Sequence, residues 1–229
     1  MWFPGHTAFG FALAVGVLAI ARNRSAGPTV FALVPFFANL IDFFHLDPIR
    51  PWSHNLLAAV AIPISALLVW RRWIRWSPPA AAALLAASTA AIIGDLVFGV
   101  FYPFAPVSWA SVGWLPFDVP LDLTVEAAAG IALLALYLTA SGHRFGSGPL
   151  RGFTGPWWIS PAMAAFLVAI LFWGECGVFF GLHFAIAGDF SPLAMFDGAL
   201  FVAVAFAYTR WFAAAGGAWL RDRAVASLA

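Results

Sequence analysis

Residues 6–24 read HTAFGFALAVGVLAIARNR, an apolar run that begins at a histidine and ends directly before Arg22 and Arg24. The run approaches the roughly 20 residues that a helix needs to cross the hydrocarbon layer of a bilayer. Its two ends differ, because one carries a titratable imidazole and the other carries permanent positive charge. The stretch therefore predicts a transmembrane helix with its basic end on one side of the membrane.

The rest of the chain contains further long apolar runs of the same kind. Of its 229 residues, 63% are hydrophobic and 9% are charged, whereas about 25% of the residues of an ordinary globular protein are charged. Long continuous apolar runs indicate helices, since a barrel would show short alternating segments. We predict an all-α polytopic membrane protein, one membrane-embedded domain with about seven transmembrane helices. The expected helices cover residues 6–21, 28–44, 54–70, 78–102, 120–140, 160–187 and 191–214.

The basic residues give this bundle an orientation. All eleven are arginines, and ten follow the first, third, fifth and seventh apolar runs. Arginine-rich loops stay in the cytoplasm, so we predict an outer N-terminus and a cytoplasmic C-terminus. Residues 216–229 are then a cytoplasmic tail that forms a short amphipathic turn on the inner surface. We expect an integral protein of a prokaryotic cytoplasmic (inner) membrane.

Composition also excludes several classes of protein. A net charge of +1 with scattered loop arginines does not suit nucleic-acid binding. The single cysteine, Cys176, allows neither an internal disulfide nor a thiolate metal cage. A retinal protein is excluded because no lysine exists to form the Schiff base. Membrane lipids are the expected partners, with a membrane-protein partner or a second copy of the chain also possible.

Polar residues within the apolar runs mark the candidate site. Asp95 lies well inside its run, where an ionised carboxylate is costly unless it is paired or binds a cation. Two histidines and two carboxylates from four helices would suit Zn²⁺ or a similar divalent ion. The histidines can instead cap helix starts, and the acids can make structural hydrogen bonds or pair with Arg50. The four candidate metal ligands are His6, Asp42, His54 and Asp95.

Further polar residues form a second rank. Asn39, Asp42 and His45 are spaced at i, i+3 and i+6, which predicts one polar strip on a helix. Glu126, Glu175 and His183 lie inside later apolar runs and are candidate general bases. Arg50 is the only arginine expected on the outer side, where it could hold an anionic headgroup.

The order of these motifs resembles the YdjM-like membrane-bound metal-dependent hydrolases. The resemblance rests on His6-x-x-x-Gly10, on Leu40-Ile41-Asp42, on Arg50-x-x-Ser53-His54, and on Gly94-Asp95 followed by Tyr102-Pro103-Phe104. It covers residues 1–105, the hydrolase-like half, and leaves three further helices in residues 106–215 outside it. Asn39 and Ala91 stand where the family pattern has an acid and a histidine.

The leading expectation is a metal-dependent hydrolase that acts on a lipid or lipid-linked ester or phosphoester at the extracytoplasmic leaflet. The metal would acidify a water molecule and polarise the acyl or phosphoryl oxygen of the substrate. Either the site is rebuilt with His45, Glu175 or His183, or the chain is a non-catalytic membrane subunit or binding protein that keeps the fold. A proton or ion carrier fits less well, because polar residues do not continue to the cytoplasmic side.

Overall fold

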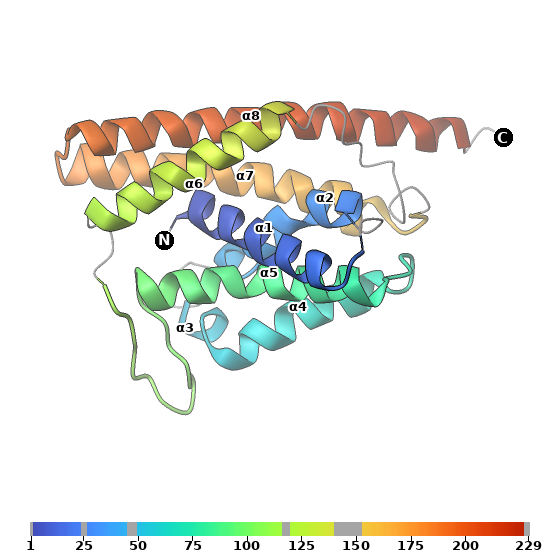
Figure 1. Cartoon of the computed structure of the whole chain (residues 1–229), viewed down its shortest axis with the longest axis horizontal. Helices are drawn as coiled ribbons and strands as arrows, with labels where there is room; N and C mark the ends of the chain where they lie inside the picture. The colour runs from blue at the N-terminus through green and yellow to red at the C-terminus, as the bar shows by residue number, and fades with distance from the viewer. Residues whose placement is uncertain (1, 24–26, 45–49, 116–119, 140–152, 227–229) are drawn as a thin grey trace.

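The structure is a computed structural model that describes residues 2–23, 27–44, 50–115, 120–139 and 153–226. Within these ranges the chain is helical, and its only β pairing consists of two isolated bridges, Phe98 to Leu115 and Phe101 to Val112. The helices form one elongated bundle with the loop of residues 98–115 projecting from it (Figure 1).

In the described part of the chain, five helical spans are long and apolar enough to cross a membrane, which indicates an integral membrane protein. They correspond to five of the seven predicted runs. Each agrees with the sequence-based boundaries to within a few residues except at the end of α8, which continues as helix to Ala226 instead of ending in a short turn. The long helices are α1 (Phe3–Ile20), α5 (Pro78–Val97), α6 (Pro120–Thr139), α7 (Pro161–Phe180) with the π-helical turn η4 (Gly181–Ile186), and α8 (Pro192–Ala226).

The two remaining predicted runs form shorter elements. The run at 28–44 gives only α2 (Gly27–Ala38), a turn, and the 3₁₀ helix η1 (Asp42–Phe44), so Asn39 and Asp42 do not share a helical strip. Pro35 lies one turn before this break, and its carbonyl oxygen accepts a hydrogen bond from the Asn39 side chain at 2.8 Å. The run at 54–70 gives α4 (Leu56–Trp70), which follows the single turn α3 (Arg50–Ser53). The number of membrane crossings stays a prediction.

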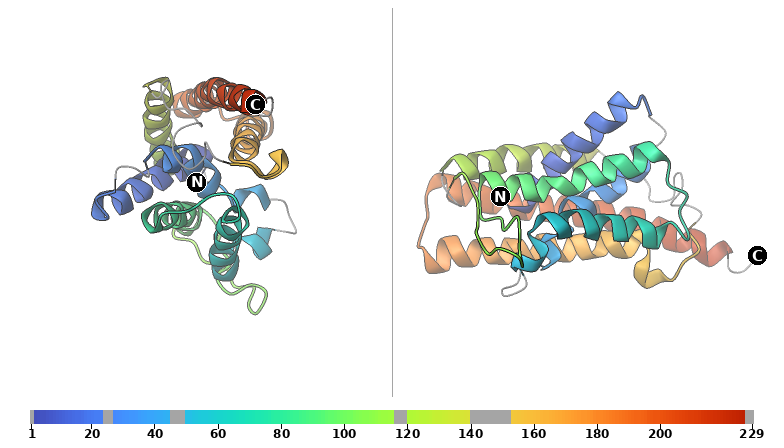
Figure 2. Two further views of the ribbon diagram at one scale, coloured as in Figure 1. Left: turned by 90° about the vertical axis from the view of Figure 1, so that its right-hand side faces the viewer. Right: turned by 90° about the horizontal axis from the view of Figure 1, so that it is seen from below.

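The N-terminal half of α1 lies in the middle of the bundle. α1 packs against α5, α2 and α6, while α8 packs against α6 and α7. Figure 2 shows α1 beginning among the other helices and its C-terminal end projecting from the bundle. Phe3 lies at the centre of an aromatic core, stacked on Phe172 at 4.1 Å between ring centroids and next to Phe201 at 5.3 Å. Because α1 is surrounded in this way, its polar residues can meet residues from both halves of the chain.

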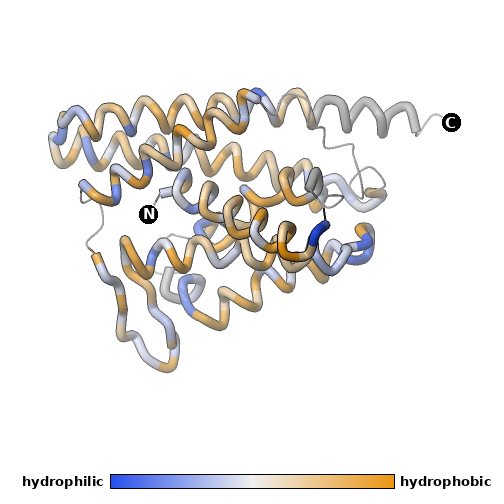
Figure 3. The backbone as a smooth tube through the Cα atoms, viewed as in Figure 1, coloured by the Kyte–Doolittle hydropathy of each residue, from blue (hydrophilic) through white to orange (hydrophobic). Residues whose placement is uncertain are grey.

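The two ends of the bundle differ in chemistry. The C-terminal end of α1 and the α4–α5 connection lie at one end, and the α5–α6 and α7–α8 connections lie at the other (Figure 1). The first pair carries four described arginines, while hydrophobic residues fill the lengths of the helices between the ends (Figure 3). The arginines are Arg22, Arg71, Arg72 and Arg75. This arrangement follows from the sequence pattern, and the side that faces the cytoplasm stays a prediction.

Candidate metal centre

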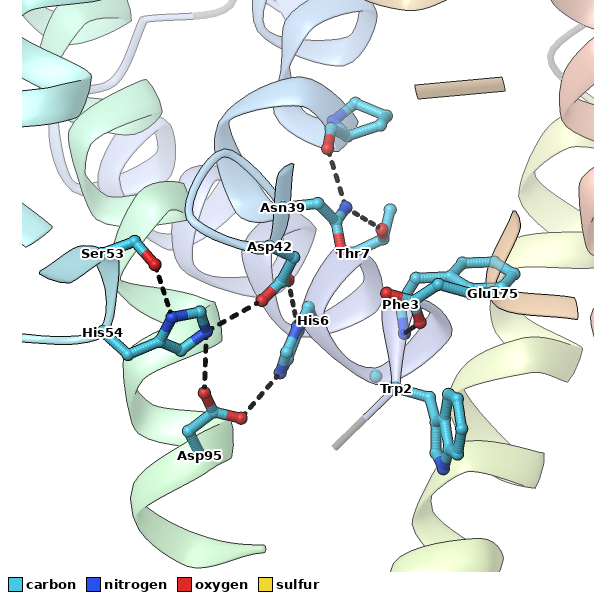
Figure 4. A network of polar contacts seen from close by, with 12 residues as sticks. Trp2, Phe3, His6, Thr7, Asn39, Asp42, Ser53, His54, Asp95 and Glu175 are labelled. Atoms are coloured by element: carbon cyan, nitrogen blue, oxygen red, sulfur yellow. Dashed lines mark hydrogen bonds and ion pairs between the residues drawn. The ribbon is translucent and has the colours of Figure 1, made fainter. Parts of the chain in front are cut away.

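The four residues predicted as metal ligands meet in one buried cluster. The histidines and carboxylates alternate, so that each imidazole faces both carboxylates (Figure 4). His6 Nδ1 lies 2.8 Å from Asp42 Oδ2, and His6 Nε2 lies 3.9 Å from Asp95 Oδ1. His54 Nε2 lies 3.4 Å from Asp42 Oδ1 and 3.3 Å from Asp95 Oδ2. We call His6, Asp42, His54 and Asp95, none of them more than 4% exposed, the His–Asp ring.

The break after α2 places Asp42 in the ring. α2 ends at Ala38, and the Asp42 N–H donates to Asn39 O at 3.0 Å in the turn that follows. The Asn39 amide group donates to Thr7 Oγ1 on α1 and to Pro35 O, both at 2.8 Å. Asn39, which stands where the family pattern has an acid, therefore fastens the end of α2 to α1.

Close contact between α1 and α2 brings His6 to Asp42. A Cβ atom on Gly10 would lie 2.6 Å from Ala38 Cβ, so only glycine lets the two helices approach this closely. Gly10 is one turn after His6 on the same helix. The His-x-x-x-Gly motif thus joins a ring residue to the small residue that permits the contact.

His54 is held from two directions. Ser53 Oγ lies 2.9 Å from His54 Nδ1, and His54 O accepts a hydrogen bond from Tyr102 N at 3.0 Å. When Nδ1–H donates to the serine, the lone pair of Nε2 faces the two carboxylates. Ser53 was not among the predicted site residues, although it directly precedes a predicted ligand.

The ring fits a divalent cation. One ligand atom from each of Asp42, His54 and Asp95 can be chosen so that the three atoms lie within 4.8 Å of one another. Ligands on a tetrahedral ion with bonds of about 2.1 Å lie roughly 3.4 Å apart, which is close to the 3.3 and 3.4 Å separations between His54 and the two carboxylates. His6 instead faces the other oxygen of each carboxylate, and its Nε2 makes no hydrogen bond within the described residues. Three of the four predicted ligands thus form a candidate ligand set, and His6 faces the carboxylate oxygens on the other side.

Glu126 and Glu175, predicted as general bases, contact the start of α1. Glu126 Oε1 accepts from Trp2 N and Oε2 from Gly5 N, both at 2.7 Å. Glu175 Oε2 accepts from Phe3 N at 3.3 Å (Figure 4). The first N–H groups of a helix have no partners within the helix, and these two carboxylates satisfy three such groups of the N-terminal segment.

His183 lies in the π-helical turn after α7. Its ring stacks on Phe179 at 4.2 Å between centroids, and its Nδ1 lies 3.5 Å from Asp189 Oδ2. Asp189 lies beyond the helical span, where a backbone hydrogen bond from Ser191 lowers the pKa of its carboxyl. The aromatic neighbour of His183 therefore comes from α7, and its acidic neighbour comes from the connection that follows the π-helical turn.

Other predicted positions complete the comparison with the sequence. His45 and the Arg50 side chain lie outside the described residues, although the backbone of Arg50 begins α3. Ala91, where the family pattern has a histidine, is buried on α5 one turn before Asp95. Asp197 on α8, which was not among the predicted site residues, is fully buried, and neither carboxylate oxygen makes a hydrogen bond within the described residues.

The fold and site define an all-helical, membrane-type protein with a buried histidine–aspartate cluster. No family model, curated protein or solved structure matches the chain.

Proposed function

We propose that the protein is an integral membrane metal-dependent hydrolase. The observation that carries the proposal is the candidate ligand set of Asp42, His54 and Asp95, which is buried inside the helix bundle. Two carboxylates in such a place need positive charge, which a divalent ion supplies. We propose zinc as this ion, because zinc accepts imidazole and carboxylate ligands and keeps an open fourth position in catalytic sites.

The four residues of the His–Asp ring have different proposed roles. Asp42 Oδ1, His54 Nε2 and Asp95 Oδ2 would hold the ion, whose chemistry is to acidify water and to polarise an acyl or phosphoryl oxygen. His6 Nδ1 lies 2.8 Å from Asp42 Oδ2 and so orients that carboxylate, while its Nε2, 3.9 Å from Asp95 Oδ1, is the proposed proton acceptor. With Glu126 and Glu175 bonded to α1, His6 replaces them as the proposed proton acceptor.

The proposed substrate is a lipid or lipid-linked ester or phosphoester at the extracytoplasmic leaflet. A site buried within membrane-type helices favours a substrate that is itself in the membrane. Arg50 remains a proposed contact for an anionic headgroup, because it begins the single turn α3 that leads to His54.

Metal analysis of the purified protein tests this proposal. We expect about one divalent ion per chain in the wild type, and loss of that ion in His54→Ala and in Asp95→Ala. Ser88→Ala is the matched control, since Ser88 is buried on the same helix as Asp95 and donates only to Leu85 O of its own helix. A wild-type protein that stays free of metal after incubation with Zn²⁺, Mn²⁺ or Ni²⁺ would refute the proposal.

A second candidate is a non-catalytic membrane subunit or binding protein. The bonding of Glu126 and Glu175 to α1 favours it, because these acids then stabilise the fold instead of serving a reaction. In that case the ring is a structural ion-pair cluster. A metal-free ring, together with a fixed membrane partner that copurifies at constant stoichiometry, would support this candidate over the hydrolase.

A further inference from the structure

The connection between α5 and α6 has an unusual composition for a loop. Residues 98–115 read FGVFYPFAPVSWASVGWL and contain no charged residue. Loops that run through water are normally polar and rich in turn-forming residues. Here aromatic and branched apolar side chains predominate, which points to a non-aqueous environment. We call residues 98–115 the aromatic loop.

The base of the aromatic loop packs on the His–Asp ring. Tyr102 N donates to His54 O at 3.0 Å, and Pro103 O accepts from Leu56 N, the first residue of α4, at 3.2 Å. A Cβ atom on Gly99 would lie 3.4 Å from Asp95 Oδ1. A Cβ atom on Gly113 would clash with Gly99 O, so the second half of the loop packs directly against Gly99. The aromatic loop is therefore fixed to two ring residues.

The aromatic loop exposes apolar side chains both in its middle and at its base. Val107 is 94% exposed, and Trp114, whose N–H donates to Leu96 O at 3.0 Å, is 77% exposed. Trp109 is half exposed and stacks edge-on against Trp52 of α3, with ring centroids 5.8 Å apart. So many large exposed apolar side chains in one loop are uncommon on a surface that faces water. Tryptophan in particular is enriched where a membrane meets water.

The helix α4, which is bonded to the base of the aromatic loop, also exposes apolar side chains. α4 begins where the loop base is bonded, and its Leu57 and Val60 are 73% and 59% exposed. Apolar residues exposed on a helix of a membrane protein face lipid chains. The aromatic loop and α4, which are bonded to each other at the base of the loop, therefore both expose apolar side chains.

We propose that the aromatic loop inserts into the lipid headgroup layer and so holds the His–Asp ring next to the leaflet. The partner is the lipid of the surrounding membrane, because the loop is uncharged, carries exposed aromatic residues and is bonded at its base to α4, which exposes apolar side chains. A substrate then reaches the ring sideways from the leaflet as an amphiphile whose reacting group lies at headgroup depth. This last step rests on the proposed function, whereas insertion of the loop does not.

Site-directed spin labelling in phospholipid vesicles tests the insertion. Cys176 is buried and is first replaced by alanine, after which a nitroxide is attached at Val107→Cys. We expect a collision rate with the water-soluble reagent nickel–EDDA that is several-fold lower than at Arg71→Cys, together with high accessibility to oxygen. Leu57→Cys is the lipid-facing reference, and Arg71, an exposed residue at the opposite end of the bundle, is the aqueous one.

Two outcomes would overturn the proposal. A label at Val107 that collides with nickel–EDDA as often as the label at Arg71 would place the loop in water. A label that neither reagent reaches would mean that protein covers the loop, either a second copy or another chain. The experiment needs neither bound metal nor activity, so a metal-free protein would remove the proposed function and leave this result intact.

Discussion

Glu126 illustrates how a buried carboxylate can belong to a helix instead of to a reaction. Each of its two oxygens accepts a backbone N–H at the start of α1, where the helix itself leaves these donors without partners. In the sequence, Glu126 lies beyond the first turn of its predicted helix, so the dipole of that helix does not account for an acid at this position. The structure shows that it serves a different helix.

Replacing this carboxylate separates a structural role from a catalytic one. Glu126→Gln removes the negative charge and turns an NH₂ group toward one of the two N–H donors, so the free energy of unfolding should fall by about 1–3 kcal/mol. Thermal unfolding in detergent micelles measures this change. Metal content should be unchanged, because Glu126 is not among the ring residues.

Glu175→Gln is the matched comparison for that experiment. Its hydrogen bond to Phe3 N is longer, 3.3 Å, and only partly buried, so its effect on unfolding should be smaller. An unaltered unfolding temperature in Glu126→Gln, or loss of metal in that variant, would contradict the structural role.

At the scale of elements, the break of α2 and the approach of α1 create the ring. A regular helix over residues 28–44 would keep Asp42 on the strip with Asn39. Pro35 and the Asn39 amide end the helix instead, and the following turn directs Asp42 toward His6 (Figure 4). The proline and the polar residues were visible in the sequence, but their combined effect depends on Thr7 of another helix.

The contact between α1 and α2 gives a second prediction. In Gly10→Ala the new methyl group would lie 2.6 Å from Ala38 Cβ, and both atoms are fixed to helix backbones. Separating the helices should lower the free energy of unfolding by about 1–3 kcal/mol and should weaken metal binding, because Asp42, a proposed ligand, would lose its contact with His6.

Gly16→Ala on the same helix is the control. No atom lies within 4 Å of a Cβ at that position, and alanine favours a helix over glycine by about 1 kcal/mol. We expect Gly16→Ala to be neutral or stabilising in thermal unfolding. Equal effects of the two substitutions would show that the α1–α2 approach is not tight.

At the scale of the whole molecule, the charges sort to the two ends of the bundle. The described loop arginines lie at the end opposite the aromatic loop and the α7–α8 connection (Figure 1). Under the positive-inside rule this end faces the cytoplasm. The His–Asp ring, which is bonded to the aromatic loop, then lies toward the outer leaflet.

Cysteine accessibility in intact cells tests this orientation. In the Cys176→Ala background, Asp189→Cys should react with a membrane-impermeant maleimide added outside, because Asp189 lies in the α7–α8 connection. Arg71→Cys should react only after the membrane is opened. The reverse pattern would invert the topology and would move the proposed substrate to the inner leaflet.

The sequence by itself determined the helical membrane class, the segregation of arginines and the four residues of the ring. These follow from hydrophobic length and from the cost of burying a charge, which are properties of each segment alone. Only the tertiary structure decided which acids meet. Asp42 and Glu126 are both buried carboxylates, but one faces two imidazoles and the other faces backbone N–H groups of α1. That difference depends on how α1 lies among α2, α5 and α6, because a carboxylate binds whichever donors the packing of the helices brings to it.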